Sequence, residues 1–386
     1  MMRIKTKLSI LLLLVLMGCI KAYDPQYKGE STKKFVVQGT LSSEEGWQEV
    51  QISRTSAVNN PQQIGVDDCQ VKIMDETEHV YALSFYGDGV YRVWMDSASL
   101  LPGKSYRIDI FTADGQHLQS DFDQMPASSP MEEVFYEIED LPTNEPEVWI
   151  HGIQFYTNLN APSEVARYYR YQLTETWEYH SAFPLEYYYD GQIQKVTPPD
   201  YTEMVCWTTL PVENIFTLST ENLDNNSFAR FPLNYVNNSS PRLSVLYSLN
   251  IRKIALSEDA FTYWDQMRIN SSQDGGLYAS QPLAIKGNMH NLTHPDQDVL
   301  GFFQASSVHT KRIFVEPVEG LELDFSNRCS PEPIEHGFVE ISPADYPAYL
   351  MTGENGEPTM LLLNDECIFC TMRGGTNVKP EYWPIK

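Results

Sequence analysis

Two cysteines near the C-terminus have the spacing of a redox motif. Cys367 and Cys370 form a Cys-x-x-Cys pair, and an oxidoreductase needs the first thiol of such a pair at the N-terminus of a helix. The residues that follow, 371–375, end in two glycines and are a poor start for a helix. The pattern therefore favours structural disulfides, with a four-cysteine zinc site as the next alternative and a redox centre last.

A second pair of chemically capable residues consists of His290 and His294. Their spacing of four places two imidazoles on one face when the segment is helical. Glycine, asparagine and proline residues between positions 287 and 295 predict a loop, where the same spacing does not bring two ligands together. We therefore expect no metal site at this pair.

No sequence motif identifies a reaction. The chain lacks a Gly-x-Ser-x-Gly nucleophile elbow, a Walker loop, a dinucleotide fingerprint and a His-Glu-x-x-His zinc helix. A pair of carboxylates for glycoside hydrolysis cannot be singled out among 52 acidic residues. The sequence thus assigns no catalytic residue and no cofactor, and it leaves open a binding protein and a hydrolase.

The first residues predict a lipoprotein signal peptide. Three basic residues precede an apolar run at 10–17 that is too short to span a bilayer. The run ends on Gly18 and Cys19, which are the small residue and the cysteine of a bacterial lipobox. We expect residues 1–18 to be removed, Cys19 to be lipidated and residues 19–32 to tether the body to a membrane.

The mature chain is strongly acidic. Residues 1–18 carry three of the 27 basic residues and none of the 52 acidic ones, so their removal changes the net charge from −25 to −28. This excess of negative charge repels phosphate backbones and anionic lipid headgroups. We therefore expect no nucleic-acid partner, and we expect the lipid to be the membrane attachment.

Five cysteines remain after lipidation, in a compartment that permits disulfides, so at least one is unpaired. Cys69 is the candidate, because strand alternation places it on the same face as Val71 and Ile73, where it would be a small buried hydrophobe. The other four are expected to form two bridges, with three connectivities open: Cys206, Cys329, Cys367 and Cys370.

The elements that would position these residues are mainly β-strands. Residues 33–125 have the pattern of an immunoglobulin-like β-sandwich, with short strands between turn residues. The clearest hairpin joins Val80–Phe85 to Val90–Met95 through two glycines. A Leu-Pro-Gly turn then leads into a strand with an early tyrosine, Tyr106, the type of residue that ties a corner of such sandwiches to the backbone.

Residues 131–386 predict a second, larger β-rich domain with one or a few helices and a cysteine-rich C-terminal tail. It follows a linker-like segment of prolines and serines at 123–130. One helix is expected over 257–269, because Ser257 can cap it and apolar residues recur after it at helical spacing.

This second half also contains an aromatic run, Tyr187, Tyr188 and Tyr189. Exposed tyrosines offer a large contact area with a polar tip, and they are common in binding surfaces. The run is therefore the candidate contact surface for a ligand or partner, with ordinary core packing as the alternative.

Several short segments occur along the chain in a characteristic order. After the lipobox they are Phe35–Gly39, Ser53–Thr55, Leu101–Ile110, Gly287–Asn288, Val299–Ser306 and a closing stretch from Cys367 to Trp383. In this order the segments resemble the Bacteroidota lipoprotein family DUF4249.

The resemblance implies an outer-membrane lipoprotein that is often encoded near TonB-dependent receptors and has no established catalytic activity. We therefore expect a lipid-anchored accessory or binding protein that associates with such a receptor in nutrient uptake. The alternative is a hydrolase of the envelope or of a polymer. A single acidic residue within 20–25 leaves the periplasmic or cell-surface face open.

Overall fold

The computed structural model consists mainly of β-strands, as the sequence predicted. It describes residues 33–56, 61–271, 285–325, 329–334, 337–352 and 358–384. The signal peptide, the lipidation site Cys19 and the tether lie outside these residues, so they stay predictions. Within the described ranges, no helix has the length and apolar character needed to cross a membrane.

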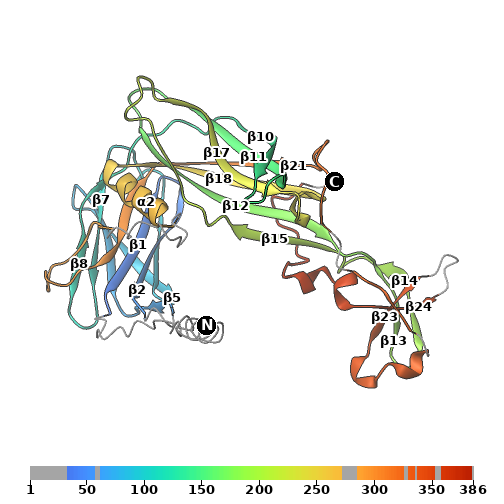
Figure 1. Ribbon diagram of the computed structural model, residues 1–386. Coiled ribbons are helices and arrows are strands. Elements are labelled where there is room, and N and C mark those ends of the chain that lie inside the picture. The colour runs from blue at the N-terminus through green and yellow to red at the C-terminus, as the bar shows by residue number, and fades with distance from the viewer. Residues whose placement is uncertain are drawn as a thin grey trace, which may run out of the picture.

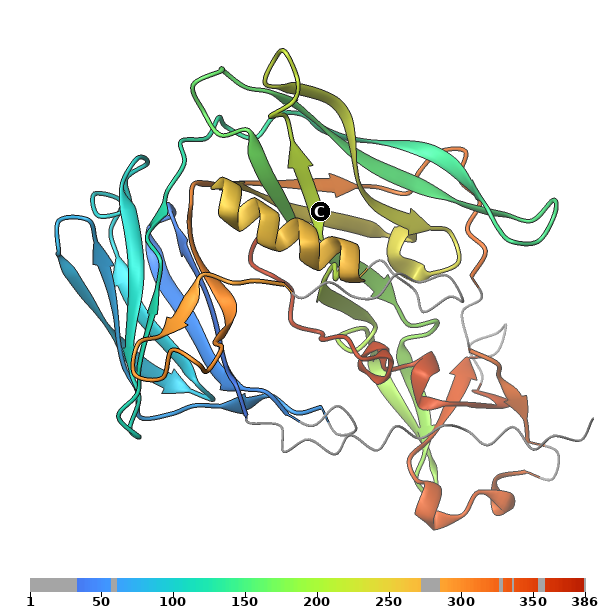
Figure 2. The same cartoon turned by 60° about the vertical axis from the view of Figure 1, so that its left-hand side comes forward.

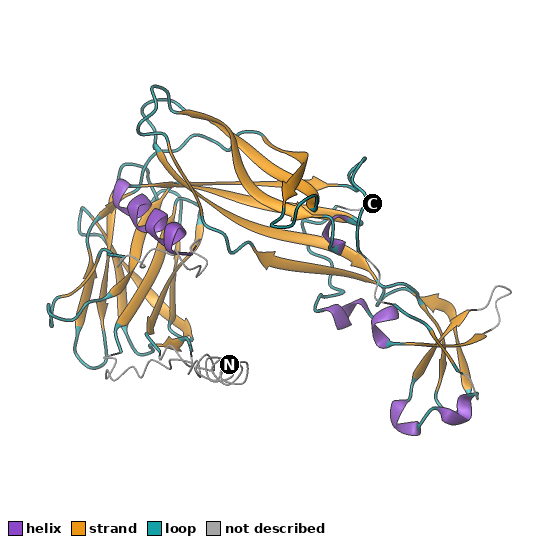
Figure 3. Cartoon of the chain, in the orientation of Figure 1, coloured by secondary structure: helices purple, strands orange, loops and turns teal. Residues whose placement is uncertain are grey.

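The chain forms three modules along an elongated body, with the first and third modules at its ends (Figures 1 and 3). The first module is one sheet in the order β19-β8-β7-β4-β5-β6-β2-β1-β20, with β3 paired to β2 and β9 paired to β7. Its strands are β1 (Phe35–Ser42), β2 (Gly46–Arg54), β3 (Ile64–Gly65), β4 (Gln70–Asp75), β5 (Val80–Gly87), β6 (Val90–Met95), β7 (Ser105–Phe111), β8 (His117–Ser120), β9 (Asp123–Gln124), β19 (Met289–Asn291) and β20 (Leu300–Ser306).

Alternating side chains close the two halves of this sheet over one core. Val37 on β1 and Ile52 on β2 meet Ile108 on β7 in the same buried cluster. The predicted hairpin is present, since β5 and β6 are joined at Gly87 to Val90. The predicted tyrosine corner is present as well, because the hydroxyl of Tyr106 donates to the backbone oxygen of Ser99 at 2.6 Å.

Part of the later chain belongs to the first module, which differs from the predicted division at residue 131. Residues 285–306 return to the first sheet, where β19 pairs with β8 and β20 lies parallel to β1. A parallel pairing between strands more than 250 residues apart leaves no local trace in the sequence, because it needs neither a hairpin nor a turn. The sandwich therefore combines strands from the start of the described chain with two strands from residues 289–306.

The second module is a sandwich of two sheets that enclose a separate core. One sheet has the order β10-β11-β17 and the other β15-β12-β18-β21, with β16 paired to β12. Phe155 from the first sheet stacks on Tyr247 from the second, with ring centroids 5.6 Å apart. The strands are β10 (Val134–Pro142), β11 (Trp149–Asn160), β12 (Tyr168–His180), β15 (Val205–Pro211), β16 (Phe216–Ser219), β17 (Ser227–Asn237), β18 (Leu246–Leu256) and β21 (Val308–Val315), with a 3-10 turn η1 (Pro241–Leu243).

A third module contains a small sheet in the order β14-β13-β23-β24-β22. It lies at the end of the body away from the first module (Figure 1). Its strands are β13 (Leu185–Tyr189), β14 (Ile193–Asp200), β22 (Glu332–Pro333), β23 (Ala348–Thr352) and β24 (Pro358–Leu363). Two 3-10 turns, η2 (Phe338–Glu340) and η3 (Pro343–Asp345), lie between β22 and β23, and two more, η4 (Asp365–Cys367) and η5 (Cys370–Arg373), follow β24.

The predicted helix is α2 (Glu258–Ser271), and it joins the first two modules. Ser257 caps it, because its hydroxyl accepts from the backbone N–H of Ala260 at 3.2 Å. The same hydroxyl donates to Asp123, which lies in β9 and also accepts from the backbone N–H of Ala305 at 2.7 Å. In Figure 2, α2 lies between the first module and the long strands of the second. Asp123 thus ties three segments together at this junction.

Burial raises the pKa of Asp123 from 3.8 to about 6. The folded chain then binds this proton more tightly than the unfolded chain, so the contribution of Asp123 is full below pH 3.8 and is lost as the pH rises through about 6. The difference corresponds to about 3 kcal/mol. We expect Asp123→Asn to remove this loss, so that urea unfolding at pH 4 and pH 7 gives a smaller pH dependence for the variant than for wild type.

The exposed neighbour Asp121 provides the control for this measurement, because Asp121→Asn changes the same chemical group outside the junction. It should leave the pH dependence of the unfolding free energy unchanged. Equal pH dependence in wild type and Asp123→Asn would contradict the assignment.

Candidate functional site

The two histidines lie on a short strand and in the segment that follows it. His290 lies on β19, a three-residue strand where the sequence predicted a loop, and its Nε2 is 2.9 Å from a carboxylate oxygen of Asp121. The backbone N–H of His294 donates to the Asn291 side chain in the turn that follows. In the part of the chain that the structure describes, no group of three or more histidine, cysteine, aspartate or glutamate side chains is arranged to hold a metal ion.

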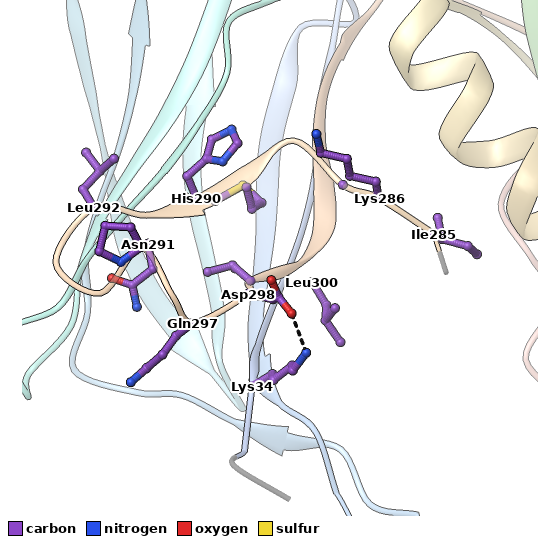
Figure 4. A pocket seen from close by; sticks show the side chains of 13 residues that line it. Lys34, Ile285, Lys286, His290, Asn291, Leu292, Gln297, Asp298 and Leu300 are labelled. Carbon is purple, nitrogen blue, oxygen red and sulfur yellow. Dashed lines mark hydrogen bonds and ion pairs between the residues drawn. The ribbon is translucent and has the colours of Figure 1, made fainter. Parts of the chain in front are cut away.

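His290 does line a hollow of about 640 Å³ on the first module, shown in Figure 4. Most of its wall is apolar, and Lys34 and Asp298 point toward each other there, with Nζ and Oδ2 2.7 Å apart. Both side chains are exposed, so this pair contributes little free energy. The other polar groups of the lining are Lys286, His290, Asn291 and Gln297.

The Cys-x-x-Cys pair is divided between two disulfides. Cys370 is bonded to Cys206, and Cys367 is bonded to Cys329. The two bridges predicted from the sequence are therefore present, and they join the C-terminal segment to β15 and to the third module. Cys69 is unpaired, as predicted. The sequence predicted a fully buried side chain, but Cys69 is half-buried, because it lies just before β4 begins at Gln70. Burial raises the pKa of its thiol.

The predicted tyrosine run is not one contact surface. Tyr187 is only 5% exposed, whereas Tyr188 is half-buried. Tyr189 stacks on Phe338 with ring centroids 4.7 Å apart and meets Tyr346 edge-on. Successive side chains of β13 point to opposite faces of the sheet, so three adjacent tyrosines cannot face one partner. Tyr187 and Tyr189 therefore pack within the third module, and a contact role for Tyr188 stays a prediction.

A polar cleft of about 500 Å³ lies between the first two modules. The outer face of β1 and β2 forms one wall, and the face of β12 and β18 that points away from the second core forms the other. The polar and aromatic residues of the lining are Gln38, Thr40, Ser42, Trp47, Gln48, Glu49, Gln51, Arg170, Gln172, Arg252 and Trp264.

The guanidinium of Arg170 lies in this cleft over the face of an aromatic ring. Its guanidinium carbon is 3.7 Å from the ring centroid of Trp264 on α2. Trp264 is itself held in place, because its indole N–H donates to Gln304 at 2.5 Å. The Nε of Arg170 is buried and has no hydrogen-bond partner among the described residues. The site thus presents a fixed guanidinium.

A second arginine lines the same wall. Arg252 donates to Glu44 at 2.9 Å and to Gln172 at 3.5 Å, so a carboxylate already compensates its charge. Glu49 is the one carboxylate among the residues that line the cleft, and it lies on the opposite wall. The charged groups of the cleft are therefore a paired arginine, an arginine without a carboxylate partner and a single glutamate.

The cleft opens beside an exposed cluster on the first module that we call the aromatic platform: Trp47, Tyr86, Arg92 and Trp94. The two tryptophans are cross-strand partners on β2 and β6, and their rings meet edge-on with centroids 5.6 Å apart. The guanidinium of Arg92 lies between Trp47 and Tyr86, 4.3 and 3.5 Å from their ring centroids. Trp47, Tyr86 and Trp94 are 52%, 62% and 54% exposed. The platform is therefore open to a partner.

Sequence reasoning assigned no role to these residues, although strand alternation carries a signal for them. Val50 and Ile52 point into the first core, so Trp47 must share the opposite face with polar residues. Likewise Tyr169 and Tyr171 are buried in the second core, so Arg170 between them must point to the other side of β12. A large aromatic or a cation on the solvent face of a strand is the pattern to search for.

A family model described as "Domain of unknown function (DUF4249)" matches residues 20–312. The chain belongs to the DUF4249 family. The matched range contains both walls of the cleft and the whole aromatic platform, and it ends before the C-terminal disulfide segment. No curated protein matches the chain.

One solved structure similar to this DUF4249 chain is trypsin-activated alpha-2-macroglobulin from Escherichia coli, with 12% sequence identity and a TM-score of 0.18. The similarity covers 59% of this chain and 15% of that chain. We draw no conclusion from a likeness this weak.

Several residues that mark the DUF4249 resemblance have a structural role where the returning segment meets the first sheet. The Asn288 side chain donates to the backbone oxygen of Phe303 at 2.8 Å and accepts from its N–H at 2.9 Å. Gly301 has φ +97, and a Cβ there would lie 1.9 Å from the Val37 oxygen, while a Cβ on Gly287 would lie 1.8 Å from the Gly301 oxygen. These family residues hold β20 against β1.

Proposed function

We propose that this chain is a lipid-anchored outer-membrane protein that acts by binding, and that its partner is a TonB-dependent receptor in the same membrane. The observation that carries the proposal is the aromatic platform. Tryptophan, tyrosine and arginine dominate the residues that contribute most to protein interfaces, and here four of them form one exposed cluster. Such residues are normally enriched in the buried cores of interfaces, so their exposure here indicates a surface that a partner covers.

The length of the segment between Cys19 and the first module supports a position of the aromatic platform close to the membrane. If Cys19 is lipidated, 13 residues separate it from the start of the first module at residue 33. An extended chain of this length reaches at most about 50 Å. The module that bears the platform therefore stays close to the membrane, where a membrane receptor is present at high effective concentration and a small interface is sufficient.

The experiment is co-purification under mild detergent of the full lipoprotein and its Trp47→Ala/Trp94→Ala variant. We expect wild type to retain the receptor and the double variant to bind it about 30-fold more weakly, since truncation of a central interface tryptophan costs about 2 kcal/mol or more.

The matched control is Trp149→Ala, because Trp149 is also 52% exposed but lies at the start of β11 on the second module. It should leave the receptor yield unchanged. Equal receptor yield from the double variant and from wild type would exclude the platform as the interface.

The alternative class, a hydrolase, has its own candidate place. A hollow of about 320 Å³ in the third module is lined by four carboxylates: Glu332, Glu340, Asp345 and Asp365. An acid and a base of a glycosidase would have to come from such a set. Turnover of a glycan by the purified protein that is abolished in Asp345→Asn/Asp365→Asn would favour this alternative over binding.

A further inference from the structure

Arg170 is a positive charge held in a cleft of a strongly acidic protein without an anion beside it. The net charge of the chain is −25, and 52 carboxylate side chains are available. None of them forms an ion pair with Arg170 among the described residues. Eight other arginines and lysines of the described chain do form ion pairs with carboxylates: Lys34, Arg54, Lys104, Arg107, Arg230, Arg242, Arg252 and Arg268.

The surroundings of Arg170 disfavour its charge in the free protein. Burial, and after it the positive charge of Arg252, lower the pKa of Arg170 to about 10. A buried cation without a counter-ion is destabilising, because desolvation is not offset by a partner. A perturbed ionisable group that lies in a cleft marks a candidate ligand site.

The geometry also fixes how the guanidinium N–H donors of Arg170 are oriented toward a ligand. Trp264 holds the guanidinium plane from one side, so the planar fork of N–H donors is preoriented. Such a fork matches the two oxygens of a carboxylate. Gln38, Thr40 and Gln172 line the cleft nearby with neutral polar groups, and Trp47 adds an apolar ring at its edge.

We propose that the cleft between the first two modules binds an organic carboxylate, with the carboxylate on Arg170 and the rest of the molecule against the glutamines and Trp47. The charges that line the cleft favour a ligand with a single negative charge. Glu44 already compensates Arg252, which leaves a single unpaired positive charge, and Glu49 on the opposite wall repels a second negative charge. The cleft shares Trp47 with the aromatic platform, whereas Arg170 belongs to the cleft alone. Carboxylate binding that depends on Arg170 can therefore fail while the receptor interface stands, and the reverse also holds.

The test is calorimetric titration of the full lipoprotein in detergent with acetate, galacturonate, inorganic phosphate and neutral galactose. We expect both carboxylates to bind more tightly than phosphate and galactose. Galacturonate binding more tightly than acetate assigns a carboxylate carried on a sugar, whereas equal affinities assign recognition of the carboxylate alone. Absence of carboxylate binding up to ~10 mM, or tighter binding of phosphate, would overturn the proposal.

Arg170→Gln should weaken carboxylate binding about tenfold or more, because it removes a charge-assisted hydrogen-bonded pair. Arg268→Gln is the matched control, since Arg268 lies on α2 outside the cleft lining and contacts Asp265 and Thr217. It should bind carboxylates as wild type does. Unchanged binding in Arg170→Gln would refute the site.

A second measurement separates ligand binding from a structural role. Without ligand, Arg170→Gln should melt at the same temperature as wild type or higher, because the variant removes an uncompensated charge. A lower melting temperature together with unchanged carboxylate affinity would assign Arg170 to packing against Trp264.

Discussion

Cys19→Ala should abolish the association of this protein with the outer membrane. The lipid on Cys19 is the expected anchor, and two or more acyl chains hold a protein stably, whereas the acidic body is repelled by anionic headgroups. The measurement is fractionation of outer membranes after a high-salt wash, which removes proteins held by charge alone. We expect nearly all of the wild type and almost none of the variant in this fraction.

Cys69→Ala is the matched control, because it removes the other cysteine expected to lack a disulfide and should leave the protein in the outer membrane. The Cys19→Ala variant keeps an uncleaved leader, whose apolar run could itself hold the protein in a membrane. A second form therefore carries the body behind an ordinary secretory signal peptide that is cleaved. That form should be recovered in solution. Recovery of both forms in washed outer membranes would contradict a lipid anchor.

Replacement of the Cys206–Cys370 disulfide by two alanines should lower the free energy of unfolding by about 5 kcal/mol in the chain-entropy description. The two cysteines are 164 residues apart, and both are fully buried. The bridge restrains a large loop of the unfolded chain, and in the folded chain it fixes the C-terminal segment to β15. Urea unfolding of the oxidised wild type and the double variant measures the difference.

The second disulfide is the internal comparison. Cys329 and Cys367 are 38 residues apart, so their replacement by alanine should cost about 1.3 kcal/mol less than loss of the longer loop. Mass spectrometry of the oxidised protein should find one free thiol in the mature body, that of Cys69. Four free thiols in the C-terminal half, or bound zinc, would contradict both bridges.

The parts of the fold with local signals were predictable. The β5 to β6 hairpin follows from its glycines, and Tyr106 forms the expected corner because turn and strand are adjacent in the sequence. The helix α2 begins after Ser257, as its capping pattern predicted. In each case the residues that decide the structure lie within a few positions of one another.

The remainder depends on contacts between distant segments. Nothing near Leu300 indicates that β20 will pair with β1, although Gly287 and Gly301 mark the close approach in retrospect. The third module combines β13 and β14 with strands more than 130 residues later, so its core was not visible and Tyr187 was misplaced on the surface. Non-local pairing of this kind has no periodicity of its own.

The candidate site was missed for a related reason. Trp47 and Arg170 lie on opposite walls of one cleft, and each is ordinary within its own strand. Their faces follow from alternation, but the approach of two modules follows from packing at α2. Binding as the class of function therefore stays a prediction from the sequence, and the structure adds where Trp47 and Arg170 lie.

We propose that the protein acts by binding a receptor through the aromatic platform. The most direct measurement introduces a photo-cross-linking residue at Tyr86, which is 62% exposed, and identifies by mass spectrometry what it captures in intact cells. The same residue at Trp149 is the matched position on the second module. We expect a TonB-dependent receptor from position 86 and none from position 149. Capture of no transporter at position 86, together with turnover of a glycan or peptide by the purified protein, would contradict receptor binding through the platform.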